Sequence, residues 1–314
     1  MVMATRQTRT DRRRKAVRAY DGDIMQRLDI VTPAGPMAVL QWNTAPPGSP
    51  RLHFAHATGM HAELYARLLT PLAGRYRITA SDSRGHGHTR LPAAVASGDR
   101  IEWEAFADDL MMVLDAVDPG APWLLAGHSM GGSMSLLAAA RHPERVLGLV
   151  LADPPFIPFA IAAGALATGV GLPSPMADQA ERRRADFPDV ATARAAYRGR
   201  GVFRSWTDDD LDAYLAGGLL SATDSVTLAC APLFEAATFR GVSLHIEPAL
   251  AALQCPFTLI AGEFGSTVPP IEFDIIAANP HCLSAQRLPG TTHFVPLERV
   301  DVIRAAIDLV AAAV

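Results

Sequence analysis

Short apolar segments that alternate with helix-like segments constrain the fold of this chain more than any other feature. Most of them are apolar on both faces, as in the strands of a parallel sheet that helices cover on both sides. The apolar segments span residues 28–31, 37–42, 51–56, 76–81, 123–126, 146–152, 257–262 and 283–288. Between them, apolar residues recur at the spacing of an amphipathic helix, over 61–73, 101–117, 133–141, 270–278 and 296–313. We therefore predict an α/β fold with a mostly parallel sheet of eight strands and helices on both of its faces.

The alternation breaks at Asp153, where two prolines follow, and it resumes only near residue 257. From 155 to 248 the chain is rich in Ala, Arg and Asp and has a helical and irregular pattern. This pattern predicts a core that a helical cap interrupts after the sixth strand. We expect the core to comprise residues 21–154 and 249–314, and the cap to comprise residues 155–248.

The first 20 residues differ from the rest, because they carry seven Arg and Lys residues in a polar stretch. A secretory signal would continue into an apolar segment, which does not follow here. We predict a basic, disordered tail over residues 1–20, and the cytoplasm is the default location.

Composition argues against several classes of protein. Hydrophobic residues make up 49% of the 314, enough for a large core that needs no metal or disulfide. The net charge of −4 argues against a nucleic-acid partner, and no run of 18 apolar residues predicts a membrane span. Three widely spaced cysteines without a C-x-x-C motif fit a reducing compartment. None of these quantities constrains the oligomeric state.

The strongest local motif lies at residues 123–132, which read W-L-L-A-G-H-S-M-G-G. It contains a G-x-S-x-G pattern between an apolar strand and a helix, which is the context that a nucleophile elbow requires. Ser129 would occupy a strained turn, where side chains at positions 127 and 131 would clash. The N–H groups at the start of the following helix would point toward the serine.

The chain resembles the α/β-hydrolase fold superfamily over about residues 24–312, and in particular its serine-nucleophile, esterase and lipase-like branch. Three further segments carry this resemblance: H-A-T-G at 56–59, D-S-R-G-H-G-H-T at 82–89, and P-G-T-T-H-F at 289–294. The related epoxide hydrolases and haloalkane dehalogenases use an aspartate nucleophile. Ser129 therefore points toward acyl transfer.

The resemblance implies that His293 is the general base for Ser129 and that backbone N–H groups of Met130 and Thr58 form the oxyanion hole. The triad acid is less clear, since Gly265 stands at the usual position of the family's aspartate. Asp153, at the end of the preceding core strand, and Glu263 are the two candidates. We favour Asp153, because some family members place the acid at that strand end.

Together these residues predict a serine hydrolase that cleaves carboxylic esters of small to medium apolar molecules, with no metal and no organic cofactor. A substrate pocket is expected beneath the cap, lined by Met60, His61, Phe156 and Trp206. Two alternatives stay open. The same triad could cleave a carbon–carbon bond or a lactone, and Gly265 in place of the acid is compatible with a catalytically inactive ligand-binding module.

Overall fold

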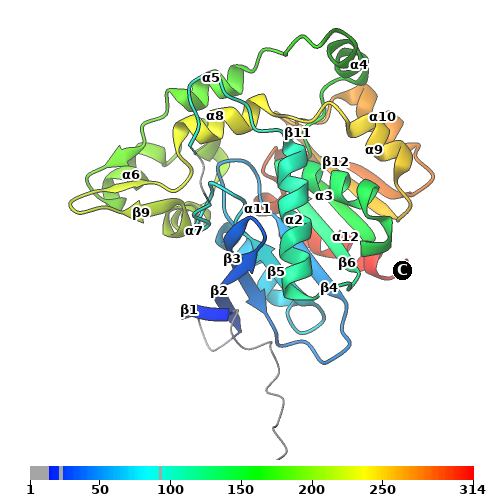
Figure 1. The fold of residues 1–314 in the computed structure, drawn as a ribbon, viewed down its shortest axis with the longest axis horizontal. Helices are drawn as coiled ribbons and strands as arrows, with labels where there is room; N and C mark the ends of the chain where they lie inside the picture. The colour runs from blue at the N-terminus through cyan, green and yellow to red at the C-terminus, as the bar shows by residue number, and fades with distance from the viewer. Residues whose placement is uncertain (1–13, 21–23, 92–93) are drawn as a thin grey trace, which may run out of the picture.

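A nine-stranded sheet runs through the centre of the computed structural model, which describes residues 14–20, 24–91 and 94–314 (Figure 1). The strand order is β1-β2-β3-β5-β4-β6-β7-β11-β12. Pairing is antiparallel from β1 to β5 and parallel from β5 to β12. The strands are β1 Arg14–Tyr20, β2 Met25–Thr32, β3 Gly35–Trp42, β4 Arg51–Ala55, β5 Arg77–Ser81, β6 Trp123–His128, β7 Val146–Ala152, β11 Phe257–Phe264 and β12 Cys282–Thr292.

The predicted α/β fold and its mostly parallel sheet are confirmed, and β2 to β7 together with β11 and β12 correspond to the eight expected strands. The ninth strand, β1, is a correction. It lies in the segment for which we predicted a disordered tail, and it pairs antiparallel with β2. An edge strand bonds through its backbone and tolerates charged side chains, so a basic sequence does not prevent pairing. Residues 1–13 of the predicted tail lie outside the described residues.

Helices cover both faces of the sheet because alternate side chains of each central strand point to opposite sides. In β6, Leu124 and Ala126 belong to one hydrophobic cluster, to which α1 and α12 contribute. Trp123 and Leu125 belong to a second cluster, to which α2 and α3 contribute. The core helices are α1 Ala66–Leu69, α2 Trp103–Val117, α3 Met130–Arg141, α10 Pro270–Ala277, α11 Val295–Glu298 and α12 Val300–Ala311.

The helix predicted over 61–73 forms three short turns instead of one continuous helix. They are η2 Ala62–Tyr65, α1 and η3 Thr70–Leu72, of which η2 and η3 are 3₁₀ turns. Pro71 lies in the first turn of η3. Since proline has no N–H to donate, it interrupts the regular i to i−4 bonding of an α-helix.

The segment between β7 and β11 forms a cap across one end of the sheet, along the top of Figure 1. It is mainly helical, as predicted, but it also contains a three-stranded sheet in the order β8-β10-β9. Its elements are α4 Phe159–Thr168, α5 Pro175–Glu181, β8 Asp186–Phe187, α6 Val190–Tyr197, η5 Gly201–Ser205, α7 Asp208–Gly218, β9 Leu219–Ser221, β10 Val226–Leu228, α8 Pro232–Arg240 and α9 Ile246–Ala252. The last of these, α9, packs against α3 of the core. Within the described residues, no helix has the length and apolarity to cross a membrane.

The carboxyl ends of the parallel strands meet at the edge of the sheet that the cap covers. Ala55 at the end of β4 aligns with Gly127 of β6, and His128 aligns with Ala152 of β7. Ala152 in turn aligns with Ile260 of β11. The loops that follow these strands therefore lie side by side, as ligand-binding loops do in open α/β sheets.

Candidate active site

Ser129 occupies a strained turn between β6 and α3. Its backbone has φ 54° and ψ −123°, which lies outside the ordinary regions for a residue with a side chain. The two glycines of the motif make the turn possible. A Cβ atom added to Gly127 would lie 2.2 Å from the carbonyl oxygen of Gly131, and one added to Gly131 would lie 2.1 Å from that of Ala55. The sequence thus folds here as a nucleophile elbow, with Ser129 at its tip.

Asp153 follows β7 and shares the unusual backbone of Ser129. Among the described residues, these two are the non-glycine residues with positive φ, and the φ of Asp153 is 44°. The side chain of Asp153 is completely buried. Its Oδ1 atom lies 3.4 Å from Nδ1 of His293. Strained backbone at both positions is typical of residues whose side chains are held for a function.

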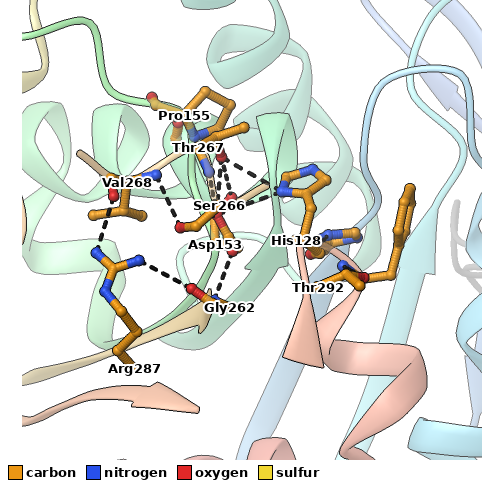
Figure 2. Close-up of polar contacts among 12 residues, drawn as sticks. His128, Asp153, Pro155, Gly262, Ser266, Thr267, Val268, Arg287 and Thr292 are labelled. Atoms are coloured by element: carbon orange, nitrogen blue, oxygen red, sulfur yellow. Dashed lines mark hydrogen bonds and ion pairs between the residues drawn. The ribbon is translucent and has the colours of Figure 1, made fainter. Parts of the chain in front are cut away.

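The loop after β11 surrounds the Asp153 carboxylate with hydrogen-bond donors (Figure 2). Oδ2 accepts from the N–H of Gly262 at 2.8 Å. Oδ1 accepts from the N–H of Thr267 at 2.7 Å, and the hydroxyls of Ser266 and Thr267 both lie 3.0 Å from it. Burial alone would raise the pKa of Asp153, but His293 and these donors outweigh burial and lower it.

Arg287 holds this loop in place, as Figure 2 also shows. One guanidinium nitrogen donates to the carbonyl of Gly262 at 2.9 Å, and the other donates to the carbonyl of Val268 at 3.0 Å. Both ends of the loop are therefore fixed to β12, the strand that leads to His293.

Glu263, the other candidate acid, points away from this cluster. Its side chain is exposed, and it accepts a hydrogen bond from the N–H of Gly290 at 2.7 Å. Gly290 lies in the segment that precedes His293. Among the described residues no contact joins Glu263 to the His293 ring, so the geometry favours Asp153 as the partner of His293.

His293 lies in a loop that hydrogen bonds hold on both sides. Glu298 accepts from the N–H and the hydroxyl of Thr292, both at 2.7 Å. The His293 side chain remains 17% exposed, whereas Asp153 is closed to solvent. No hydrogen bond joins the Ser129 hydroxyl to the His293 ring in the described part of the chain. Such bonds are often long in unliganded hydrolases and tighten with substrate.

Backbone N–H groups without a described acceptor occur at the elbow and in the loop after β4. The loop after β4 packs directly on the elbow, since a Cβ on Gly131 would approach the carbonyls of both Ala55 and His56. Within the described residues, the N–H groups of Met130 and Thr58 have no acceptor. The Thr58 side chain is buried, and its hydroxyl likewise lacks a described partner. These groups are available to an anionic oxygen at this position.

The four residues predicted to line a pocket all lie near this edge of the sheet. Phe156 is buried and donates its N–H to the carbonyl of Thr267 in the loop after β11, called the acid loop below. Trp206 of the cap packs edge-on against Phe294, with ring centroids 5.1 Å apart. Met60 and His61 are buried in the loop after β4. His61 bonds through Nε2 to the carbonyl of Tyr214 in α7 at 2.8 Å, so it ties this loop to the cap.

Five histidines are buried in the core and the loops beneath the site. Burial lowers the pKa of His53, His86 and His128 to about 3 and of His56 to about 4, and it also lowers the pKa of His61. All five are therefore neutral at pH 7. Among the described residues, no group of three or more His, Cys, Asp or Glu side chains is arranged to hold a metal ion.

Arg84, in the 82–89 segment, joins this segment to α2. Its guanidinium makes two hydrogen bonds of 2.5 Å to the buried Asp109 of α2. This leaves Arg84 engaged with the core.

Sequence reasoning missed the hydroxyl donors at Ser266 and Thr267. A signal was present, because a Ser-Thr pair directly follows the glycine that replaces the family's usual acid. Sequence reasoning also missed Tyr65, whose hydroxyl lies 2.8 Å from Nδ1 of His128. A tyrosine in an apolar segment gives no such signal, since it resembles ordinary core.

Known proteins share this fold and parts of this sequence. Human monoglyceride lipase is 33% identical over 115 residues, or 35% of this chain and 37% of the lipase. The chain thus matches little more than a third of that relative's length. A pimeloyl-[acyl-carrier protein] methyl ester esterase from Edwardsiella ictaluri is 27% identical over 263 residues, 82% of this chain and 91% of the esterase. The crystal structure of E-2-(acetamidomethylene)succinate hydrolase superposes with a TM-score of 0.71 at 22% identity, covering 92% of this chain and 99% of that one.

The model of the alpha/beta hydrolase fold family matches residues 50–299. This range includes the elbow, the acid loop and His293, and it covers well over half of the chain. The protein therefore belongs to the α/β-hydrolase fold family.

Proposed function

We propose that the protein is a serine hydrolase that cleaves carboxylic esters of small to medium apolar molecules through an acyl-enzyme. The observation that carries this proposal is the strained Ser129 elbow beside the buried Asp153–His293 pair. The methyl ester esterase that matches 82% of the chain lends further support.

The proposed reaction begins with attack of the Ser129 hydroxyl oxygen on the ester carbonyl carbon. His293 takes the hydroxyl proton through Nε2 and returns it to the leaving alcohol, while Asp153 accepts a hydrogen bond at Nδ1 and stabilises the imidazolium. The N–H groups of Met130 and Thr58 stabilise the oxyanion of the tetrahedral intermediate. Water, deprotonated by His293, then attacks the acyl carbon, and the His293 imidazolium returns that proton to the Ser129 oxygen as the acyl bond breaks, which releases the acid and the free serine.

The proposed preference for apolar substrates rests on the cap. We propose that the cap comprises residues 155–248 and acts as a lid over the site. Aromatic side chains of the cap form a continuous cluster in which Phe203, Trp206 and Tyr214 pack against one another. Through Trp206 this cluster reaches Phe294, which follows His293. Met60, His61 and Phe156 would complete the pocket wall. Such an apolar, water-poor pocket would favour small to medium apolar esters.

Labelling with a fluorophosphonate probe tests the nucleophile. We expect the wild-type protein and a Ser284→Ala control to be labelled, and Ser129→Ala to remain unlabelled. Ser284 lies on β12, outside the proposed machinery. An unlabelled wild-type protein would contradict the proposal.

A panel of p-nitrophenyl esters, lactones and ring-cleavage dienoates tests the bond. Turnover of esters above the Ser129→Ala background supports an esterase. Turnover of only the lactones or dienoates would replace ester cleavage with one of those reactions. No turnover above the background for any substrate would indicate an inactive binding module.

A further inference from the structure

His128 lies directly before Ser129, and both of its ring nitrogens are engaged. Nε2 lies 2.8 Å from the carbonyl oxygen of His293, and Nδ1 lies 2.8 Å from the hydroxyl of Tyr65. The Tyr65 hydroxyl also accepts from the N–H of Ala57 at 3.3 Å. These three bonds join the elbow to the His293 loop on one side. On the other side they join it to the loop after β4, which contains Ala57 and Thr58 and is called the oxyanion loop below.

The direction of each bond follows from the chemistry of its partners. A carbonyl oxygen can only accept, so Nε2 of His128 carries the proton and donates to His293. In the neutral ring Nδ1 is then an acceptor, and it takes the hydroxyl proton of Tyr65. The Tyr65 oxygen is left to accept from Ala57. All three bonds are satisfied only by one tautomer of neutral His128.

The surroundings keep His128 in that state. Both His128 and Tyr65 are completely buried. Burial, reinforced by the nearby His293 ring, lowers the pKa of His128 to about 3, while burial raises the pKa of Tyr65. The rings of His128 and His293 have their centroids 4.8 Å apart. Transient protonation of His293 during catalysis would therefore disfavour a second positive charge on His128, and the chain of bonds would persist through the reaction.

We propose that His128 is a positioning residue that holds the base, the nucleophile and the oxyanion loop in one fixed arrangement. The chain of bonds runs from the Ala57 N–H through Tyr65 and His128 to the backbone of His293. This inference rests on the proposed serine hydrolase function. A shift of about 1 Å in a catalytic group can slow an enzyme about 100-fold, so loss of the anchor at His293 is expected to reduce kcat more than substrate binding.

The test compares three substitutions at His128 and Tyr65 with a matched control, using the full chain and a p-nitrophenyl ester. His128→Asn keeps an acceptor near Tyr65 but is too short to reach the His293 carbonyl, and we expect kcat to fall 10- to 100-fold with KM within about threefold. His128→Gln places an amide N–H near the position that Nε2 occupies in the wild type, where it can donate to the His293 carbonyl. This variant should recover at least part of the lost kcat. Tyr65→Phe breaks only the link to the oxyanion loop and should lower kcat less, by about 3- to 10-fold.

The control is His53→Asn. His53 is equally buried on β4, but its Nε2 bonds the Ser81 hydroxyl, and within the described residues its ring makes no hydrogen bond to the elbow, to the loop after β4 or to the His293 segment. This variant is expected to lose stability without losing kcat. If folded His128→Asn matches its kcat, or if Gln restores nothing, the inference is wrong.

If His128→Asn does not fold, Tyr65→Phe tests the inference in its place. A wild-type kcat in Tyr65→Phe would contradict the proposed chain of bonds. Failure of the proposed function is distinguishable, since the wild type would then hydrolyse the ester no faster than Ser129→Ala, whatever the effect of substitutions at position 128.

Discussion

Two carboxylates follow neighbouring parallel strands, β7 and β11, and their surroundings differ in almost every respect. Asp153 is fully buried, has a strained backbone and is held by donors from Gly262, Ser266 and Thr267 beside His293. Glu263 is exposed, and among the described residues it accepts a hydrogen bond only from the backbone N–H of Gly290, which precedes His293. The donors around the carboxylate, and not its distance along the chain from the usual position, therefore distinguish the acid that we propose.

Removing each carboxylate is the most direct way to break this comparison. Asp153→Asn is expected to lower kcat by roughly 10⁴-fold, because an amide cannot stabilise the His293 imidazolium and can favour the wrong tautomer. Glu263→Gln should leave kcat within about threefold of the wild type. Steady-state hydrolysis of a p-nitrophenyl ester measures both. Equal losses in the two variants would contradict the assignment.

A carboxylate restored at the family's usual position would sharpen the comparison. Gly265 has φ +62°, and a Cβ there would meet no atom within 4 Å. Aspartate tolerates this backbone better than most residues. In the Asp153→Asn background, Gly265→Asp should recover about 10- to 100-fold in kcat, whereas Gly265→Ala should recover nothing. No gain from the aspartate would mean that β7 alone can supply the acid in this chain.

The hydroxyl donors offer a smaller test of the same idea. Thr267→Val keeps the shape of the side chain but removes a hydroxyl 3.0 Å from Oδ1 of Asp153. We expect kcat to fall about tenfold, because loss of a supporting hydrogen bond loosens the acid. Ser266→Ala should cost about threefold, since the backbone donors remain. Wild-type rates in both variants would show that the backbone N–H groups suffice.

The smallest expected effect concerns stability at acid pH. The pKa of Asp153 is lowered in the folded protein, so its ionised form stabilises the fold above the ordinary aspartate pKa near 4. That contribution is lost as the pH falls through the lowered value. The unfolding free energy of the wild type minus that of Asp153→Asn should therefore be constant above pH 5 and decrease below pH 4. Guanidinium titrations followed by circular dichroism would measure it, and a pH-independent difference would argue against an ionised Asp153.

The core of the fold could be predicted from sequence because each element carries its own periodic signal. The apolar runs marked the eight strands, and the elbow glycines marked Ser129. The strands of the cap, such as Asp186–Phe187, are too short to show a period. The choice between Asp153 and Glu263 depended on Ser266 and Thr267, which reach Asp153 only when β7 and β11 pair side by side. Such a contact between distant segments leaves no pattern in one sequence.

The five buried histidines couple unfolding of the protein to the uptake of protons. Burial lowers the pKa of four of them, His53, His56, His86 and His128, to about 3 or 4, whereas an exposed imidazole has a pKa near 6.5, and it also lowers the pKa of His61. On unfolding below pH 6.5 each of these four rings takes up a proton, so stability falls as the pH drops from about 6.5 toward 4. Each proton contributes about 1.4 kcal/mol per pH unit in that window. Acid would therefore weaken the fold beneath the proposed active site before it protonates Asp153.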